Sequence, residues 1–66
     1  MKNRLKIERA ILDITQEELA LKIGVSRQTI NSIETNRYVL STILALKISK
    51  VFGKAVNDIF ELENED

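Results

Sequence analysis

Residues 15–34 read TQEELALKIGVSRQTINSIE, and this stretch decides the fold. Its first four residues form a capping-box pattern, in which the Thr15 hydroxyl accepts from the Glu18 amide and the Glu18 carboxylate accepts from the Thr15 amide. The helix that starts there is expected to stop at Gly24, because glycine adopts a positive φ without strain. Ser26 is then a second N-cap. The stretch therefore predicts two short helices joined by a tight turn.

Apolar residues recur at helical spacing along nearly the whole chain, which contains no proline. We therefore expect an all-α protein in which the two helices of the motif occupy residues 16–23 and 27–35. Three further helices are predicted at residues 4–12 after Asn3, at residues 42–52 between Ser41 and Gly53, and near residues 57–60. The expected apolar positions of the first helix are Leu5, Ile7, Ala10 and Ile11. Those expected in the other helices are Leu19, Ala20, Ile23, Ile30, Ile33, Leu44, Ala45, Ile48, Val51, Phe52, Ile59 and Phe60.

The chain has 66 residues and contains neither cysteine nor histidine. This composition excludes disulfides and the usual zinc ligands, and it removes the commonest pairs of nucleophile and base found in enzymes. No apolar run reaches the about 20 residues that span a bilayer, and residues 1–9 lack the apolar core of a signal peptide. We therefore expect one cytoplasmic domain over residues 1–66 that is not an enzyme and has no metal, cofactor or small-molecule ligand.

Charge is divided unevenly along the chain although the formal net charge is zero. Residues 1–38 carry seven Lys and Arg against five Asp and Glu, which gives +2, and the remainder carries three against five, which gives −2. A basic front half suits a protein that presents one face to phosphate groups. The acidic tail, residues 61–66, is interpreted as a solubilising segment.

A short helix, a glycine-containing turn and a second helix form a helix-turn-helix arrangement. The residues that fill it, 15–20, 23–30 and 33–34, closely resemble the Cro/C1-type repressor family, also called the xenobiotic-response-element family. The similarity runs over about residues 3–61 and is greatest to minimal members that consist of the DNA-binding domain alone. It implies a compact five-helix, lambda repressor-like fold whose motif, about residues 16–35, places its second helix in the major groove.

The resemblance implies base reading by outward residues at the start of the second helix of the motif. Arg27 and Gln28 match the family's base-reading positions, since arginine can donate twice to guanine and glutamine can pair with adenine. Ser32 matches a third reading position, and Asn31 shares the same polar face. The alternative is that these residues form only a solvated helix face.

Contacts to the DNA backbone are implied at the edges of the motif. Gln16, the first residue of its first helix, resembles the family's phosphate-contacting glutamine, and a helix N-terminus suits an anion. Further backbone contacts are expected from Thr29, Asn36, Arg37 and Tyr38. The alternatives are that Gln16 only favours helix initiation, and that Arg37 and Tyr38 are loop residues without a ligand.

An ion pair between Arg9 and Glu34 is also implied, because the family typically pairs an arginine of the first helix with the glutamate that ends the recognition helix. Its role would be structural, since it would orient these two helices against each other. Losing one partner would leave a partly buried charge without compensation.

Several positions depart from the family pattern toward a more apolar surface. Positions that are often charged or polar in the family are occupied here by Ile11, Leu12, Leu21 and Ile43. Glu8, in contrast, stands where the family usually has an apolar residue. Clustered exposed apolar residues often form an interface, and a two-fold dimer suits so small a protein. The candidate dimer contacts are Val39, Leu40, Ile43, Val56 and Ile59. The alternative is that several of them complete the core of a single chain.

Together these features predict a sequence-specific regulator of transcription that binds double-stranded DNA and is associated with the nucleoid. We expect a homodimeric repressor of a pseudo-palindromic operator, with its two recognition helices one DNA turn, about 34 Å, apart. Two alternatives stay open. One is a protein-interaction module on the same fold, which the neutral net charge and the apolar surface favour. The other is an antitoxin or restriction-controller type of regulator, which would use the same DNA chemistry.

Overall fold

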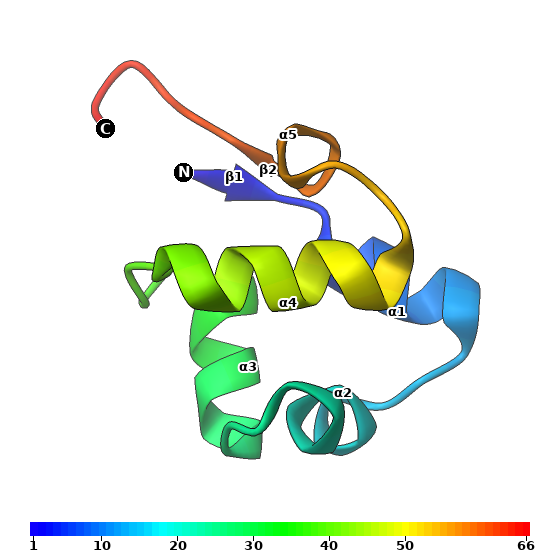
Figure 1. Cartoon of the computed structure of the whole chain (residues 1–66). Coiled ribbons are helices and arrows are strands. Elements are labelled where there is room, and N and C mark those ends of the chain that lie inside the picture. Colours follow the sequence, from blue (N-terminus) through cyan, green and yellow to red (C-terminus); the bar gives the residue numbers. More distant parts are fainter.

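Five helices and a pair of two-residue strands form the chain, and the structure, a computed structural model, describes residues 1–66 (Figure 1). In chain order the elements are β1 (Lys2–Asn3), α1 (Leu5–Leu12), α2 (Gln16–Ile23), α3 (Arg27–Glu34), α4 (Thr42–Phe52), α5 (Val56–Ile59) and β2 (Phe60–Glu61). The five predicted helices are confirmed, and their ends differ from the expected ones by one residue at most. None of these helices is both long enough and apolar enough to cross a membrane.

Side-chain caps begin α2, α3 and α4, as the sequence predicts. At α2 the Glu18 amide donates to the Thr15 hydroxyl (3.0 Å) and the Thr15 amide donates to the Glu18 carboxylate (2.9 Å), which completes the capping box. The hydrogen bond from the Thr15 amide lowers the pKa of Glu18, because it stabilises the charged carboxylate. Ser26 and Ser41 accept from the amides three residues on and so cap α3 and α4. Gly24 ends α2 in the left-handed conformation, with φ of 75°.

Asn3 caps α1 as predicted, but it lies one residue before the N-cap position because the helix begins at Leu5 and not at Arg4. Arg4 occupies the N-cap position without a side-chain hydrogen bond, whereas Asn3 Oδ1 accepts from the Leu5 amide at 3.1 Å. The Asn3 Nδ2 donates to the Ile33 carbonyl at 3.0 Å and to Asn36 Oδ1 at 2.8 Å. One side chain therefore caps α1 and also ties its start to the end of α3.

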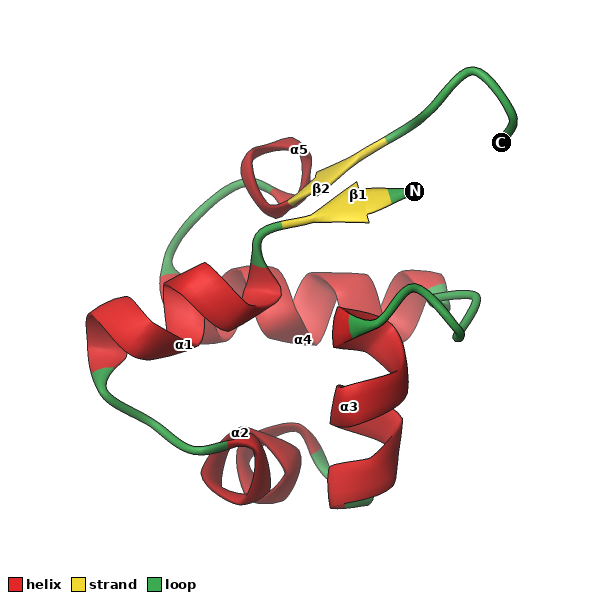
Figure 2. Ribbon diagram, turned by 180° about the vertical axis from the view of Figure 1, so that it is seen from behind, coloured by secondary structure: helices red, strands yellow, loops and turns green.

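A short antiparallel ladder between β1 and β2 is the part of the fold that the all-α prediction lacked (Figure 2). Asn3 pairs with Phe60 and Lys2 with Glu61, and the ladder continues into a hydrogen bond from the Arg4 amide to the Ile59 carbonyl at 2.8 Å. Two residues per strand are too few to show an alternating pattern, so the sequence carried no signal for this pairing.

The acidic tail after β2 folds back onto Met1. The Met1 ammonium lies 3.1 Å from Glu63 Oε1 and 3.0 Å from Asp66 Oδ2. The hydrogen bonds that it donates to Asp66 and Glu63 raise the pKa of this ammonium. The interpretation of residues 61–66 as only a solubilising segment is therefore incomplete, because the tail also makes specific contacts.

The core is formed by ten buried apolar residues contributed by all five helices and β2. They are Leu5, Leu19, Ala20, Ile23, Ile30, Ile33, Leu44, Ile48, Ile59 and Phe60. Val51 and Phe52, which were also expected in the core, are half-buried against it. Figure 1 shows α4 lying across the molecule, with α2 and α3 on one side of it and the strands and α5 on the other.

The buried face of α1 differs from the predicted one. Ile7 and Ile11 are 48% and 63% exposed, and Ala10 is exposed as well. Glu8 is instead 2% exposed, and its carboxylate oxygens lie 2.9 and 3.1 Å from the Lys54 ammonium. Helical periodicity indicates which residues share a face, but the packing of the turn after α4 decides which face is covered.

Candidate nucleic-acid interface

The helices α2 and α3 form a tightly packed unit and cross each other steeply (Figures 1 and 2). The apolar side chains between and behind them are nearly inaccessible, at 3% exposure or less: Leu19, Ala20, Ile23, Ile30 and Ile33. In the turn, the amides of Gly24 and Val25 both donate to the Ala20 carbonyl, at 2.8 and 3.0 Å. The packing and the turn together hold α3 rigidly with one polar face outward.

The outward face of α3 is polar and uncharged apart from one arginine. Arg27, Gln28 and Asn31 are exposed, and Ser32 is half-buried. The first turn contains no acidic residue, and Arg27 takes part in no ion pair within the chain. The structure thus brings together the four predicted base-reading residues and leaves the guanidinium of Arg27 free for an external acceptor.

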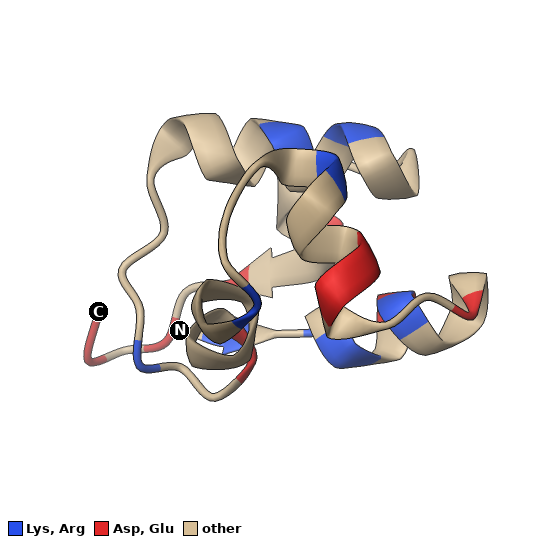
Figure 3. Cartoon of the chain, turned by 90° about the horizontal axis from the view of Figure 1, so that it is seen from below, with Lys and Arg blue, Asp and Glu red and all other residues tan.

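Charges of both signs are interspersed around α2 and α3 instead of forming a continuous basic face (Figure 3). This agrees with the formal net charge of zero. A uniform basic face would attract any polyanion, and the mixed distribution of charge offers no such face.

Thr29 takes part in the cap of α3. Its amide donates to Ser26 Oγ at 3.2 Å, and the two hydroxyls share a hydrogen bond of 2.9 Å. Thr29 is half-buried. Its hydroxyl therefore organises the N-terminus of α3, and the contact to the DNA backbone predicted for Thr29 stays a prediction.

The Arg9 and Glu34 side chains form a bidentate ion pair that links α1 to the end of α3. Arg9 Nε lies 2.6 Å from Glu34 Oε2, and Arg9 Nη2 donates to Glu34 Oε1 at 3.1 Å. Arg9 Nη1 donates to the Ile14 carbonyl at 3.0 Å. The side chains are 14% and 5% exposed, and the hydrogen bonding to Glu34 raises the pKa of Arg9 above its already high ordinary value.

Gln16 does not present its amide nitrogen to the outside. Its Nε2 donates to Glu34 Oε1 at 3.1 Å and to Asn31 Oδ1 at 3.3 Å, so both amide hydrogens have acceptors within the chain. The phosphate contact that the resemblance implies for Gln16 stays a prediction. A phosphate contact by the side chain would first require these two bonds to break.

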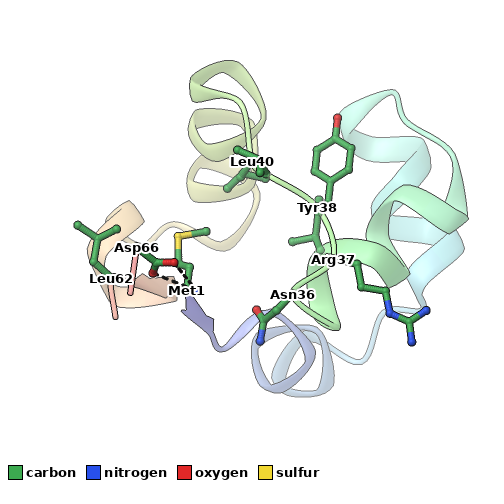
Figure 4. Close-up of a pocket in the computed structure, with 9 residues that line it drawn as sticks. Met1, Asn36, Arg37, Tyr38, Leu40, Leu62 and Asp66 are labelled. Atoms are coloured by element: carbon green, nitrogen blue, oxygen red, sulfur yellow. Dashed lines mark hydrogen bonds and ion pairs between the residues drawn. The ribbon is translucent and has the colours of Figure 1, made fainter. Parts of the chain in front are cut away.

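The remaining residues predicted to contact the DNA backbone lie in the loop after α3, and their side chains differ in how they are used within the chain. Asn36 has a left-handed conformation, with φ of 60°, and its Oδ1 accepts from Asn3, which gives this side chain a structural role. Arg37 and Tyr38 are exposed, and Figure 4 shows their side chains pointing away from Met1 and Asp66 in different directions. The side chains of Arg37 and Tyr38 form no hydrogen bond within the chain, whereas Asn36 has only its Nδ2 left to donate.

The predicted dimer contacts divide into exposed and buried residues. Val39 and Ile43 are 95% and 68% exposed, and Leu40 and Val56 are half-buried against the core. Ile59 is 1% exposed, so its assignment to an interface was wrong: it completes the core beside β1. Leu12 and Leu21 are exposed on other faces, as the departures from the family pattern suggested. Ile11 is exposed as well, which agrees with those departures but not with the position that helical spacing gave it.

The sequence interpretation missed Leu46 and Leu62, which are 59% and 77% exposed. Leu46 lines a shallow hollow with Met1, Leu40 and Val56, and Leu62 lines the neighbouring hollow drawn in Figure 4. The position of Leu46 three residues after Ile43 on α4 was a signal that could have identified it, because residues at this spacing are neighbours on a helix surface.

Comparison with known proteins agrees with this geometry. The family model named helix-turn-helix matches residues 5–59. An uncharacterized HTH-type transcriptional regulator of Methanocaldococcus jannaschii is 53% identical over 66 residues, covering 100% of both chains, and the uncharacterized regulator YgzD of Bacillus subtilis is 47% identical with the same coverage. A further regulator, from Archaeoglobus fulgidus, is 44% identical over 100% of this chain and 93% of its own. The chain belongs to the helix-turn-helix family of the Cro/C1, or xenobiotic-response-element, type.

Proposed function

We propose that this protein regulates transcription by binding double-stranded DNA in a sequence-specific manner, with α3 in the major groove. The outward face of α3 carries the proposal: Arg27, Gln28 and Asn31 are exposed on a helix that the core and the Arg9–Glu34 pair hold in place. The relatives named as HTH-type transcriptional regulators support it. A protein that acts in this way would be found with the nucleoid.

The side chains on α3 have the donors and acceptors that major-groove reading needs. Arg27 can donate twice to guanine O6 and N7, and Gln28 can donate to adenine N7 while it accepts from adenine N6. Both residues lie in the first turn of α3, which is the part of a recognition helix that approaches base edges. Ser32 reaches less far, and Arg37 would bind phosphate from the loop.

Loss of one base-reading residue is expected to relax specificity at one base pair in each half-site. Operator sequences would be selected from a pool of random duplexes, and affinity would be measured by fluorescence anisotropy at two salt concentrations. Gln28→Ala or Arg27→Ala should weaken specific binding by about 1–3 kcal/mol and leave non-specific binding nearly unchanged.

Lys6→Ala is the control, because Lys6 is exposed on α1 and forms no ion pair. An equal loss of affinity for all sequences would instead make the substituted residue a phosphate contact. Wild-type protein without any sequence preference would contradict the proposal and favour the protein-interaction module.

The repressor is further proposed to act as a two-fold dimer that blocks polymerase at a pseudo-palindromic operator. The surface formed by Val39, Ile43, Leu46 and Leu62 supports the dimer, because all four side chains are more than half exposed. Val39, Leu46 and Leu62 line the two hollows that share Met1, and Ile43 lies three residues before Leu46 on α4. So much clustered apolar surface is unusual on a monomer. A two-fold axis through it would pair two copies of α3 for successive major grooves.

Ile43→Glu is expected to abolish cooperative binding of two copies to a duplex that carries both half-sites, while binding to a single half-site persists. Stoichiometry would be measured by sedimentation velocity and cooperativity by anisotropy. Ile11→Glu is the matched control, since Ile11 and Ile43 are 63% and 68% exposed on different helices. Equal behaviour of the two variants would argue against the proposed dimer surface.

A further inference from the structure

The side chains of Arg9, Glu34, Gln16 and Asn31 form a continuous chain of hydrogen bonds that runs from α1 to the outward face of α3. Glu34 accepts from Arg9 through both oxygens, and its Oε1 also accepts from Gln16 Nε2 at 3.1 Å. Gln16 Nε2 donates in turn to Asn31 Oδ1 at 3.3 Å. Three of the four residues are shielded from solvent, and only Asn31, at the end of the chain, is exposed.

The Glu34 carboxylate determines which group donates and which accepts at each step of this chain of hydrogen bonds. An ionised carboxylate can only accept, and this one is 5% exposed and paired with Arg9. Gln16 must therefore turn its NH₂ group, and not its carbonyl oxygen, toward Glu34. The second hydrogen of the same NH₂ group lies toward Asn31, so Asn31 must turn its oxygen inward. Turning Gln16 round would place its oxygen against Glu34 Oε1, and turning Asn31 round would then place its NH₂ group against that of Gln16.

We infer that this chain of hydrogen bonds holds Asn31 as a donor toward the DNA, so that Asn31 favours guanine and disfavours cytosine at the base pair it faces. The inference rests on the proposed function. Asn31 is exposed one turn after Arg27, and its NH₂ group is the part left free. Guanine offers two acceptors, N7 and O6, in the major groove, whereas cytosine offers the donor N4.

The inference differs from the behaviour of an unconstrained asparagine. Such a residue pairs with adenine by donating from its NH₂ group to N7 and accepting from N6 with its oxygen, so both groups must face the base. In this protein Asn31 Oδ1 is directed at Gln16, so this oxygen is not turned outward to accept from adenine N6 while that hydrogen bond holds. Gln16 and Glu34 are therefore positioning residues: they touch no base but select among bases through Asn31.

Gln16→Met tests the inference, because methionine keeps the length of the side chain and removes the donor. The base preferences of wild-type protein, Asn31→Ala and Gln16→Met would be measured on operators substituted at every position. Asn31→Ala identifies the base pair that Asn31 faces. At that base pair, Gln16→Met should reduce the preference for guanine over adenine by about 3–10-fold, the effect of one lost hydrogen bond. Preferences at the pairs that depend on Arg27 and Gln28 should remain.

A double variant separates positioning from general destabilisation. Once Asn31 is alanine, adding Gln16→Met should change the base preference no further, because the two residues act through one contact. A Gln16→Met variant with wild-type preference at this base pair would overturn the inference, and so would wild-type protein that prefers adenine or cytosine there. Absence of any sequence preference in wild-type protein would overturn the proposed function itself, together with this inference.

An independent readout in wild-type protein does not depend on the folding of any variant. In ¹⁵N NMR spectra the side-chain NH₂ of Gln16 should exchange slowly with solvent, since both of its hydrogens have acceptors, and the NH₂ of Asn31 should exchange fast until DNA is added. Fast exchange at Gln16 in the free protein would overturn the inference.

Discussion

Replacing Arg9 with methionine is expected to lower the free energy of unfolding by about 3–5 kcal/mol, the usual cost of removing one member of a buried ion pair. Glu34, with a side chain that is 5% exposed, would lose its ion-pair partner and retain only the hydrogen bond from Gln16. The Ile14 carbonyl would also lose the donor that lies 3.0 Å from it. The unfolding free energy would be measured by urea denaturation followed by circular dichroism at pH 7.

Lys6→Met is the matched control for this measurement, since Lys6 lies on the same helix, is exposed and has no ion-pair partner. We expect it to change stability by less than about 0.5 kcal/mol. Replacing Arg9 and Glu34 together with apolar residues should recover much of the loss, because no buried charge then remains. If Arg9→Met costs no more than Lys6→Met, the pair does not contribute to holding α1 against α3.

Ile30→Ala is expected to lower the free energy of unfolding by about 2–5 kcal/mol, since it removes buried methyl and methylene groups and leaves a cavity between packed helices. Ile30 is 0% exposed and belongs to the core that holds α3. A chain of this length has a total stability of roughly 3–10 kcal/mol, so the variant should lose a large fraction of it and unfold at a clearly lower temperature. Thermal unfolding followed by circular dichroism would show this directly.

The same substitution at Ile11 provides the control. Ile11 is 63% exposed on α1, and Ile11→Ala should change stability by no more than about 0.5 kcal/mol. Similar losses at the two positions would mean that α1 buries the face predicted from the sequence and not the face that contains Glu8. The comparison therefore tests the packing of α1 as well as the core.

Features that depend on residues close together in the chain were predictable. The capping box at Thr15, the hydroxyl caps at Ser26 and Ser41, and the left-handed stop at Gly24 are all present. Each depends on one side chain and a backbone group within four positions of it, so tertiary packing has little opportunity to change the outcome. The same holds for the order of side chains along α3, which determines that Arg27, Gln28 and Asn31 share a face.

Features that depend on distant contacts were mispredicted or missed. Ile7 and Ile11 were expected to be buried and are exposed, because the turn after α4 places Lys54 over Glu8 on the other face of α1. Ile59 was expected both in the core and among the dimer contacts, and only its place in the core is confirmed. The ladder of β1 with β2 could not be foreseen from segments of two residues each.

The sequence by itself determined the five helices, their ends and the identity of the residues on the outward face of α3, because these follow from backbone hydrogen bonds and caps within a few positions. Only the tertiary structure decided how that face is presented. The Glu34 carboxylate is brought to Gln16 by the packing of three helices, and it can accept but not donate. That asymmetry turns the Gln16 amide inward and leaves Asn31 to donate outward, which no pattern in the chain encodes locally.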